Sequence, residues 1–146
     1  TFLLQDLDQS NLLLSQAIEQ KPDFALAHFV RASVLLRINE VNPTRSSKQP
    51  QITPLSELNE TIRLAPDFAQ AYYNRANLYV KAGDLTQARF DYNRAISLNK
   101  HFAEAYFNRG LLSYSEGRIK EGTSDLSRAG ELGLYQAYGL IKRMNN

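Results

Sequence analysis

An internal repeat limits the fold of this chain more than any other feature of its sequence. Aligning residues 68–101 with residues 102–135 gives 12 identities in 34 positions. The identical pairs include an aromatic, an arginine and a glycine: Tyr72/Tyr106, Arg75/Arg109 and Gly83/Gly117. A fixed period of this length is typical of repeat arrays, in which each unit buries its apolar face against its neighbours.

Each repeat contains the pattern of two helices. In residues 68–82, Tyr72, Ala76 and Tyr79 recur at i, i+4 and i+7, which places them on one face of a helix. A second apolar stripe runs through residues 85–98. Gly83 suits the left-handed residue that ends a helix, and Asp84 suits the N-cap of the next one. The repeat is therefore predicted to be an antiparallel helix pair.

These residues resemble the tetratricopeptide repeat family, whose pattern is an aromatic, Leu-Gly, Tyr, and later Ala and an aromatic. In this sequence the pattern reads Tyr72, Arg75-Ala76, Tyr79, Ala88 and Tyr92. Arg75 stands where the family usually has Leu, and Lys100 stands where a Pro closes the repeat. The resemblance implies an all-α fold: a right-handed superhelical solenoid of antiparallel helix pairs, about eight helices in total, whose first helices line an inner surface.

Extended to the whole chain, the pattern predicts one repeat domain over residues 1–146. The string Pro-Asp-Phe-Ala at Pro22 recurs at Pro66, so the helix before Pro22 is a second helix without a first. We expect either a chain cut from something longer or an unusual cap. The predicted segments are an orphan second helix at 6–20, repeats at 24–64, 68–99 and 102–130, and an orphan or capping helix at 135–144.

The first repeat contains a long predicted loop at residues 39–53, which is rich in Ser and Pro and has no apolar period. Within it, residues 41–51 are predicted to be the most mobile internal region, because no apolar period anchors them. Thr53 and Pro54 are suitable residues for the N-cap and first position of the following helix.

Composition and motifs argue against several functional classes. The net charge of +2 and the scattered basic residues do not favour nucleic acid. No apolar run approaches the ~20 residues that span a bilayer, and cysteine is absent. Metal-binding, phosphate-binding and nucleophile motifs are missing. His28 occupies the place of Tyr72 and is predicted to be a core residue. We therefore predict a chain that is not an enzyme and takes no cofactor or metal.

The most regular charges recur once per repeat. Arg31, Arg75 and Arg109 each precede an acid at the same phase of the following helix, namely Glu57, Asp91 and Asp125. One interpretation is a ladder of arginines that binds an anion. The favoured interpretation is an ion pair that joins the two helices of each repeat, partly exposed and worth only ~0–1 kcal/mol.

The predicted binding surface lies on the other face of the first helices. Phe29, Tyr73 and Phe107 would form an aromatic row, and Asn74 and Asn108 a short amide row beside it, although Val30 interrupts this row. Grooves of the resembled family commonly bind extended peptides, and an asparagine amide offers both a donor and an acceptor to a peptide backbone. The predicted peptide-binding residues are Phe29, Gln70, Tyr73, Asn74, Asn77, Lys81, Glu104, Phe107 and Asn108.

Three functions remain open at this stage. The first is a non-catalytic protein–protein interaction module that binds a peptide or partner protein in its concave groove. The second is a structural spacer or self-association segment of a larger multidomain protein, with contacts through exposed terminal helices. The third, an RNA-binding helical repeat, is the weakest because no basic stripe is present. Accessible groove aromatics would favour the first, and a symmetric contact that buries them the second.

Overall fold

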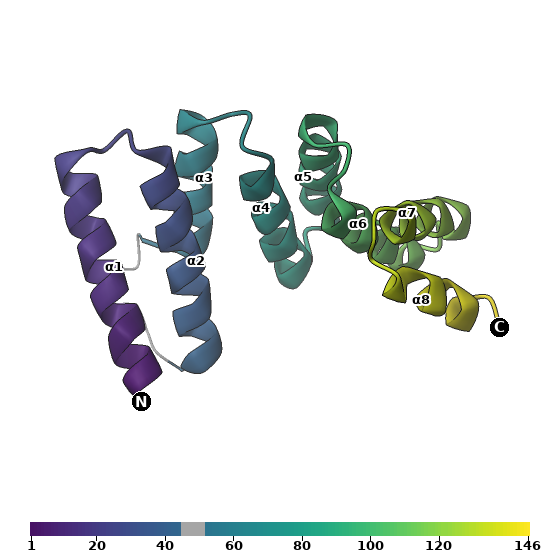
Figure 1. Cartoon of the computed structure of the whole chain (residues 1–146), viewed down its shortest axis with the longest axis horizontal. Coiled ribbons are helices and arrows are strands. Elements are labelled where there is room, and N and C mark those ends of the chain that lie inside the picture. Colours follow the sequence, from purple (N-terminus) through teal and green to yellow (C-terminus); the bar gives the residue numbers. More distant parts are fainter. Residues whose placement is uncertain (45–51) are drawn as a thin grey trace. The chain divides into compact units, whose positions relative to one another are not determined.

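The computed structural model describes residues 1–44 and 52–146, and all regular structure within them is helical (Figure 1). The helices are α1 (Phe2–Gln20), α2 (Ala25–Val41), α3 (Pro54–Leu64), α4 (Ala69–Ala82), α5 (Leu85–Leu98), α6 (Ala103–Ser115), α7 (Ile119–Glu131) and α8 (Gln136–Met144). The prediction of an all-α fold of paired helices is confirmed. The chain forms two compact units, residues 1–71 and 72–146, which are described separately.

Unit 1 is organised around α2, which packs against both α1 and α3. Its buried apolar side chains are few: Ala27, Ala32 and Ile38 from α2, Leu58 from α3 and Ala71 from the start of α4. No residue of α1 is buried, so this helix covers α2 with partly exposed side chains only. The unit therefore relies on polar buried groups as well, and the ion pair described below lies at its centre.

Unit 2 contains most of α4 and all of α5 to α8, with two apolar clusters. The first consists of Ala76, Ala88, Tyr92 and Leu112, and the second of Leu126, Ala129 and Ala137. The alanines allow helices to approach closely, and Tyr92, only 2% exposed, fills the remaining space. Large rings packed between small residues thus replace the leucine-rich core of many helical proteins.

The turns inside the two later repeats follow the sequence closely. Gly83 and Gly117 have φ values of +80° and +75°, a conformation that residues with a Cβ rarely adopt. Asp84 caps α5 by accepting a hydrogen bond from the Gln87 backbone N–H at 3.2 Å. Its counterpart before α7 is Arg118, whose side chain makes no capping hydrogen bond.

Gly122, on α7, is explained by a close contact that the sequence does not reveal. A Cβ at this position would lie 2.5 Å from the Tyr114 ring and 2.9 Å from the Gly110 carbonyl oxygen. The equivalent residue one repeat earlier is Ala88, where the counterpart of Tyr114 is the smaller Val80. The glycine therefore makes room for the tyrosine.

Two predicted boundaries need correction. α1 begins at Phe2 rather than at residue 6, since no helix breaker precedes Asp6. α2 continues to Val41, so residues 39–41 of the predicted loop are helical. Residues 39–41 contain no proline or glycine that would break the helix, and the first proline after α2 is Pro43. Residues 41–51 were predicted to be mobile. Residues 45–51 of this segment lie outside the described residues, so the prediction is not tested.

Candidate functional site

A chain of polar contacts links α4, α5 and α6 and includes Asn108, one of the two residues of the predicted amide row. Asn108 donates from Nδ2 to the Asn77 Oδ1 at 3.0 Å and to the Tyr73 Oη at 3.1 Å. Tyr92 donates its hydroxyl to the same Asn77 Oδ1 at 2.6 Å. We call Tyr73, Asn77, Tyr92 and Asn108 the amide network. Its geometry fixes the orientation of both asparagine side chains, because each has one end held by the protein.

One end of each amide remains available. Among the described residues, the Asn77 Nδ2 and the Asn108 Oδ1 make no hydrogen bond to the chain. The first is a donor and the second an acceptor, and both side chains are partly exposed. The surface therefore presents a donor and an acceptor from adjacent first helices, the pair of groups that a peptide unit needs.

Tyr92 was not predicted as part of this surface, yet it supports it. Burial raises the pKa of the Tyr92 phenol well above its ordinary value of 10, with a smaller contribution in the same direction from Tyr73. The hydroxyl therefore stays protonated and acts as a hydrogen-bond donor to Asn77. The apolar period of α5 predicts Tyr92 as a core residue, and nothing in the sequence indicates that its hydroxyl reaches α4.

The predicted aromatic residues are partly buried, each against other rings or apolar side chains. The Tyr73 ring lies 4.9 Å from the Phe102 ring, with an angle of 40° between the planes. In unit 1, the Phe29 ring lies 4.6 Å from that of Phe68. Phe107 packs on the cluster formed by Leu126, Ala129 and Ala137. Their exposed edges remain candidates for contact with a partner.

The other predicted site residues differ in exposure. Gln70 and Asn74 are partly buried on α4, whereas Lys81 at its end and Glu104 at the start of α6 are exposed. Gln70 belongs to unit 1 together with Phe29, and the rest of the predicted set belongs to unit 2. The amide network brings Tyr73, Asn77 and Asn108 of this set together.

The predicted ion pairs are present in all three repeats. Arg75 and Arg109 each form a bidentate pair with Asp91 and Asp125, with Nε–Oδ2 distances of 2.7 Å. Their hydrogen bonds to these carboxylates raise the pKa of both guanidinium groups. In unit 1, Arg31 binds Glu57 in the same way at 2.8 Å. The structural interpretation is confirmed, because these arginines are held by carboxylates of their own repeat.

The expected partial exposure holds for Arg109–Asp125, with side chains 21% and 12% exposed, but not for Arg31–Glu57 or for Asp91. The Asp91 side chain is fully buried, and those of Arg31 and Glu57 are 8% and 6% exposed. His28 adds to the first pair: its Nδ1 lies 3.0 Å from Glu57 Oε2 and its Nε2 lies 3.0 Å from the Pro22 carbonyl oxygen. The prediction that His28 is a core residue is confirmed, since it is 6% exposed.

Two further observations concern the described part of the chain only. Within residues 1–44 and 52–146, no three potential ligand side chains gather as they would around a metal ion. In the same residues, no helix combines the length and hydropathy that crossing a bilayer requires.

Comparison with known proteins places this arrangement in a class, that of helical-repeat proteins built from stacked helix pairs. The model of the tetratricopeptide repeat family matches residues 69–102. No curated protein matches the chain at the sequence level. The family match and the likeness to solved structures described next confirm the resemblance to the tetratricopeptide repeat family.

Solved structures share the fold at low sequence identity. A crystal structure of MamA has a TM-score of 0.78 and 19% identity, and the match covers 94% of this chain and 75% of that one. A MamA structure from Desulfovibrio magneticus RS-1 has a TM-score of 0.70, 19% identity, and coverages of 91% and 70%. The first tetratricopeptide repeat domain of Spaghetti (RPAP3), bound to an HSP90 peptide, has a TM-score of 0.68, 19% identity, and coverages of 83% and 90%. At this level of identity, these structures show a shared fold.

Proposed function

We propose that this chain binds an extended peptide segment of a partner protein on the surface formed by α4 and α6 in unit 2. The observation that carries the proposal is the amide network, which leaves a donor on Asn77 and an acceptor on Asn108 facing away from their internal partners. These two groups match the C=O and N–H of a peptide unit.

The network also lowers the entropic cost of binding. A free asparagine side chain loses rotamer freedom when it binds, whereas Asn77 and Asn108 are already fixed by hydrogen bonds to each other and to two tyrosines. The exposed edges of Tyr73 and Phe107 would lie under apolar side chains of the peptide, and Asn74 and Gln70 would extend the polar row along α4. Support from outside the chain comes from the RPAP3 domain, a structure of similar fold that holds a peptide.

The surface has one charged residue of each sign at its ends. Lys81 lies at the end of α4 and Glu104 at the beginning of α6, and both are exposed. Because no cluster of like charge is present at these positions, binding is expected to depend little on salt concentration.

The test is affinity capture from the native source with the double variant Asn77→Ala/Asn108→Ala. The matched control is Asn39→Ala, which removes an exposed asparagine from α2. The proposal expects a specific partner retained by the wild-type protein and the control and lost by the double variant, with unchanged helical circular dichroism. A partner retained equally by all three proteins would contradict the proposal.

A second candidate function, self-association, is favoured by apolar side chains at the ends of the chain. α1 exposes Phe2, Leu3, Leu12 and Leu13, and Phe2 is 87% exposed. Exposed apolar residues that cluster on one helix usually mark a contact surface. Sedimentation velocity of wild-type protein and Leu12→Ser/Leu13→Ser tests this: concentration-dependent association abolished by the variant supports it, and a monomer at all concentrations opposes it.

A further inference from the structure

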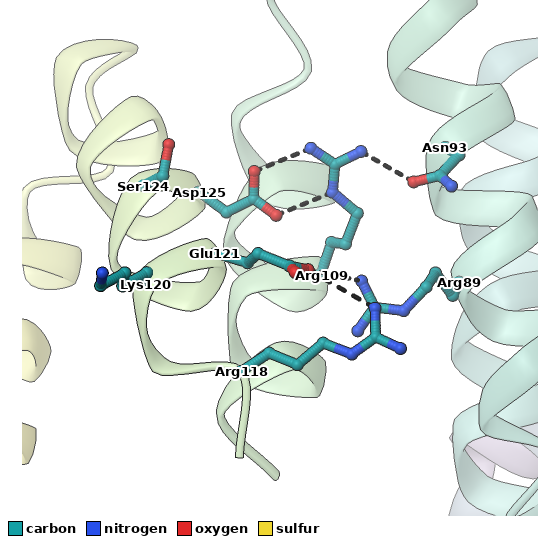
Figure 2. Close-up of a pocket in the computed structure, with 8 residues that line it drawn as sticks. All are labelled: Arg89, Asn93, Arg109, Arg118, Lys120, Glu121, Ser124 and Asp125. Atoms are coloured by element: carbon teal, nitrogen blue, oxygen red, sulfur yellow. Dashed lines mark hydrogen bonds and ion pairs between the residues drawn. The ribbon is translucent and has the colours of Figure 1, made fainter. Parts of the chain in front are cut away.

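A pocket in unit 2 lies away from the amide network and has a volume of about 540 Å³ (Figure 2). Its walls come from α5, α6 and α7. Four basic residues take part in the lining, which consists of Arg89, Asn93, Arg109, Arg118, Lys120, Glu121, Ser124 and Asp125. A volume of this size is sufficient for a small ligand or for one to two side chains of a partner.

Some lining residues of this pocket recur at the equivalent positions one repeat earlier, and others do not. Arg109 donates hydrogen bonds to both Asp125 and Asn93, and the same three residue types occur one repeat earlier. The remaining lining differs between the repeats: the positions of Arg89, Arg118 and Lys120 are occupied there by Leu55, Asp84 and Thr86. Ser124 likewise replaces Phe90 and leaves space. The extra cations are therefore not required by the repeat fold.

Arg89 and Arg118 both have guanidinium N–H groups without a hydrogen-bond acceptor in the described part of the chain. Arg89 donates through Nη2 to Glu116 and Ser113, while its Nε is buried without a partner among the described residues. The Arg118 side chain makes no hydrogen bond to the described part of the chain, and its contacts with Glu116 and Glu121 are 3.7 and 3.6 Å. Buried or crowded guanidinium donors without acceptors call for an additional acceptor.

Glu121 shows where such an acceptor would be placed. One of its carboxylate oxygens lies 3.9 Å from Arg89 Nη1 and 3.6 Å from Arg118 Nη1, too far for a hydrogen bond to either. Figure 2 shows this carboxylate beside the two guanidinium groups, with Arg109 held apart by Asp125 and Asn93. The Glu121 side chain is 60% exposed and can move aside. An oxyanion that is not tethered to α7 would be free to approach both guanidinium groups more closely than the Glu121 oxygen does.

We propose that this pocket binds an oxyanion between Arg89 and Arg118, with Lys120 at the rim and Glu121 as an internal competitor. The chemistry is shared by the carboxylate of an acidic side chain on a protein partner and by free inorganic phosphate, since guanidinium groups bind both through paired N–H donors. The site is independent of the peptide surface, because it uses none of the residues of the amide network.

The experiment is a titration of the ¹⁵N-labelled full chain at low salt, observed through backbone amides of residues 117–125 and arginine Nε–H signals. One arm uses inorganic phosphate and the other a triglutamate peptide, with triglutamine as its uncharged counterpart. The variants are Arg118→Gln, Glu121→Gln and, as a control of equal charge change, Lys142→Gln on α8. Arg118 and Glu121 are both exposed, so these changes leave the fold intact.

The proposal expects saturable shifts confined to the pocket, about tenfold weaker affinity in Arg118→Gln, and stronger affinity in Glu121→Gln. The control is expected to behave as the wild-type protein. Saturation by phosphate alone identifies a small-ion site, and saturation by triglutamate but not triglutamine identifies an acidic partner. The proposal is overturned if neither probe saturates, if Arg118→Gln and Lys142→Gln weaken binding equally, or if Glu121→Gln does not strengthen it.

Discussion

The first repeat, in unit 1, and the two later repeats, in unit 2, use the same ion pair in different surroundings. Arg31–Glu57 is accompanied by His28, whereas Arg75–Asp91 and Arg109–Asp125 lie beside Tyr72 and Tyr106. The Arg75 and Arg109 guanidinium carbons lie 5.7 and 5.6 Å from the centres of those tyrosine rings. The arginine and its acid recur in every repeat, and the residues around them do not.

The amide network shows the opposite behaviour. In the first repeat, Val30 occupies the position of Asn74 and Asn108. Ser33 occupies the position of Asn77. The Ser33 hydroxyl donates to the carbonyl oxygen of Phe29 on its own helix at 3.2 Å. The comparison teaches that features shared by all repeats maintain the helix pair, while features confined to one unit are the better candidates for binding. The predictions below test this distinction.

The largest expected effect concerns the buried acid of the first repeat. Glu57→Ala leaves the Arg31 charge and His28 without their carboxylate, and the side chains of the pair are almost fully buried. We expect a loss of roughly 3–5 kcal/mol in the free energy of unfolding, measured by urea denaturation. Asp125→Ala is the matched variant in unit 2, where the pair is more exposed, and should cost about 1–3 kcal/mol. Equal costs would show that the surroundings of the pair do not matter.

Gly122 provides the next largest effect. Gly122→Ala should cost about 1–3 kcal/mol, because the new methyl group overlaps the Tyr114 ring. Adding Tyr114→Val gives the Ala–Val combination of residues 88 and 80 and should recover the stability lost to the clash with the ring, whereas the close contact with the Gly110 carbonyl oxygen remains. A double-mutant cycle measured by thermal and urea unfolding gives the coupling. Additive effects of the two changes would refute the steric explanation.

The Tyr92 hydroxyl should make unit 2 sensitive to alkaline pH. Burial raises the pKa of this phenol in the folded protein above its value in the unfolded chain. Above pH ~10 the unfolded state therefore holds fewer protons than the folded state, and stability falls as pH rises. Tyr92→Phe should remove this component and cost about 1 kcal/mol at neutral pH. Unfolding curves at pH 8 to 11 that fall in parallel for both proteins would rule out the effect.

The smallest effect concerns the helix starts of the two later repeats. Asp84→Ala removes the N-cap of α5 and should cost about 0.5–1 kcal/mol. Arg118→Ala, at the same position before α7, removes no cap and only exposed, long ion pairs, so stability should change by less than about 0.5 kcal/mol. The difference is measured by urea denaturation of both variants, and a larger loss for Arg118→Ala would contradict this assignment.

The sequence predicts much of the fold because its signals are periodic. The 34-residue repeat, the glycines at 83 and 117 and the recurring arginines all depend on spacing along one chain, and the structure shows the helix pairs and ion pairs that they predict. The site is harder to predict. The hydrogen bond from Tyr92 to Asn77 and the contact of Gly122 with Tyr114 depend on the distance between helices, which side-chain packing sets.

The helical period of the sequence also fails to predict how deeply individual side chains are buried. Tyr73 was placed on a face opposite to the core stripe, yet its ring packs against Phe102 and its hydroxyl accepts from Asn108. A helical wheel separates faces of one helix and takes no account of the neighbouring first helix, which covers part of that ring. The sequence therefore indicated which residues gather on this surface, but not how they contact one another.

The central claim is that unit 2 recognises the backbone of an extended peptide through Asn77 and Asn108. The most direct measurement is isothermal titration calorimetry with a binding peptide taken from the captured partner and with versions N-methylated at single successive residues. The account predicts that methylation at one register position weakens binding at least about tenfold in the wild-type protein, because a backbone donor to Asn108 is lost. In Asn108→Ala the same methylation should have little further effect. Full affinity for every N-methylated peptide would contradict the claim.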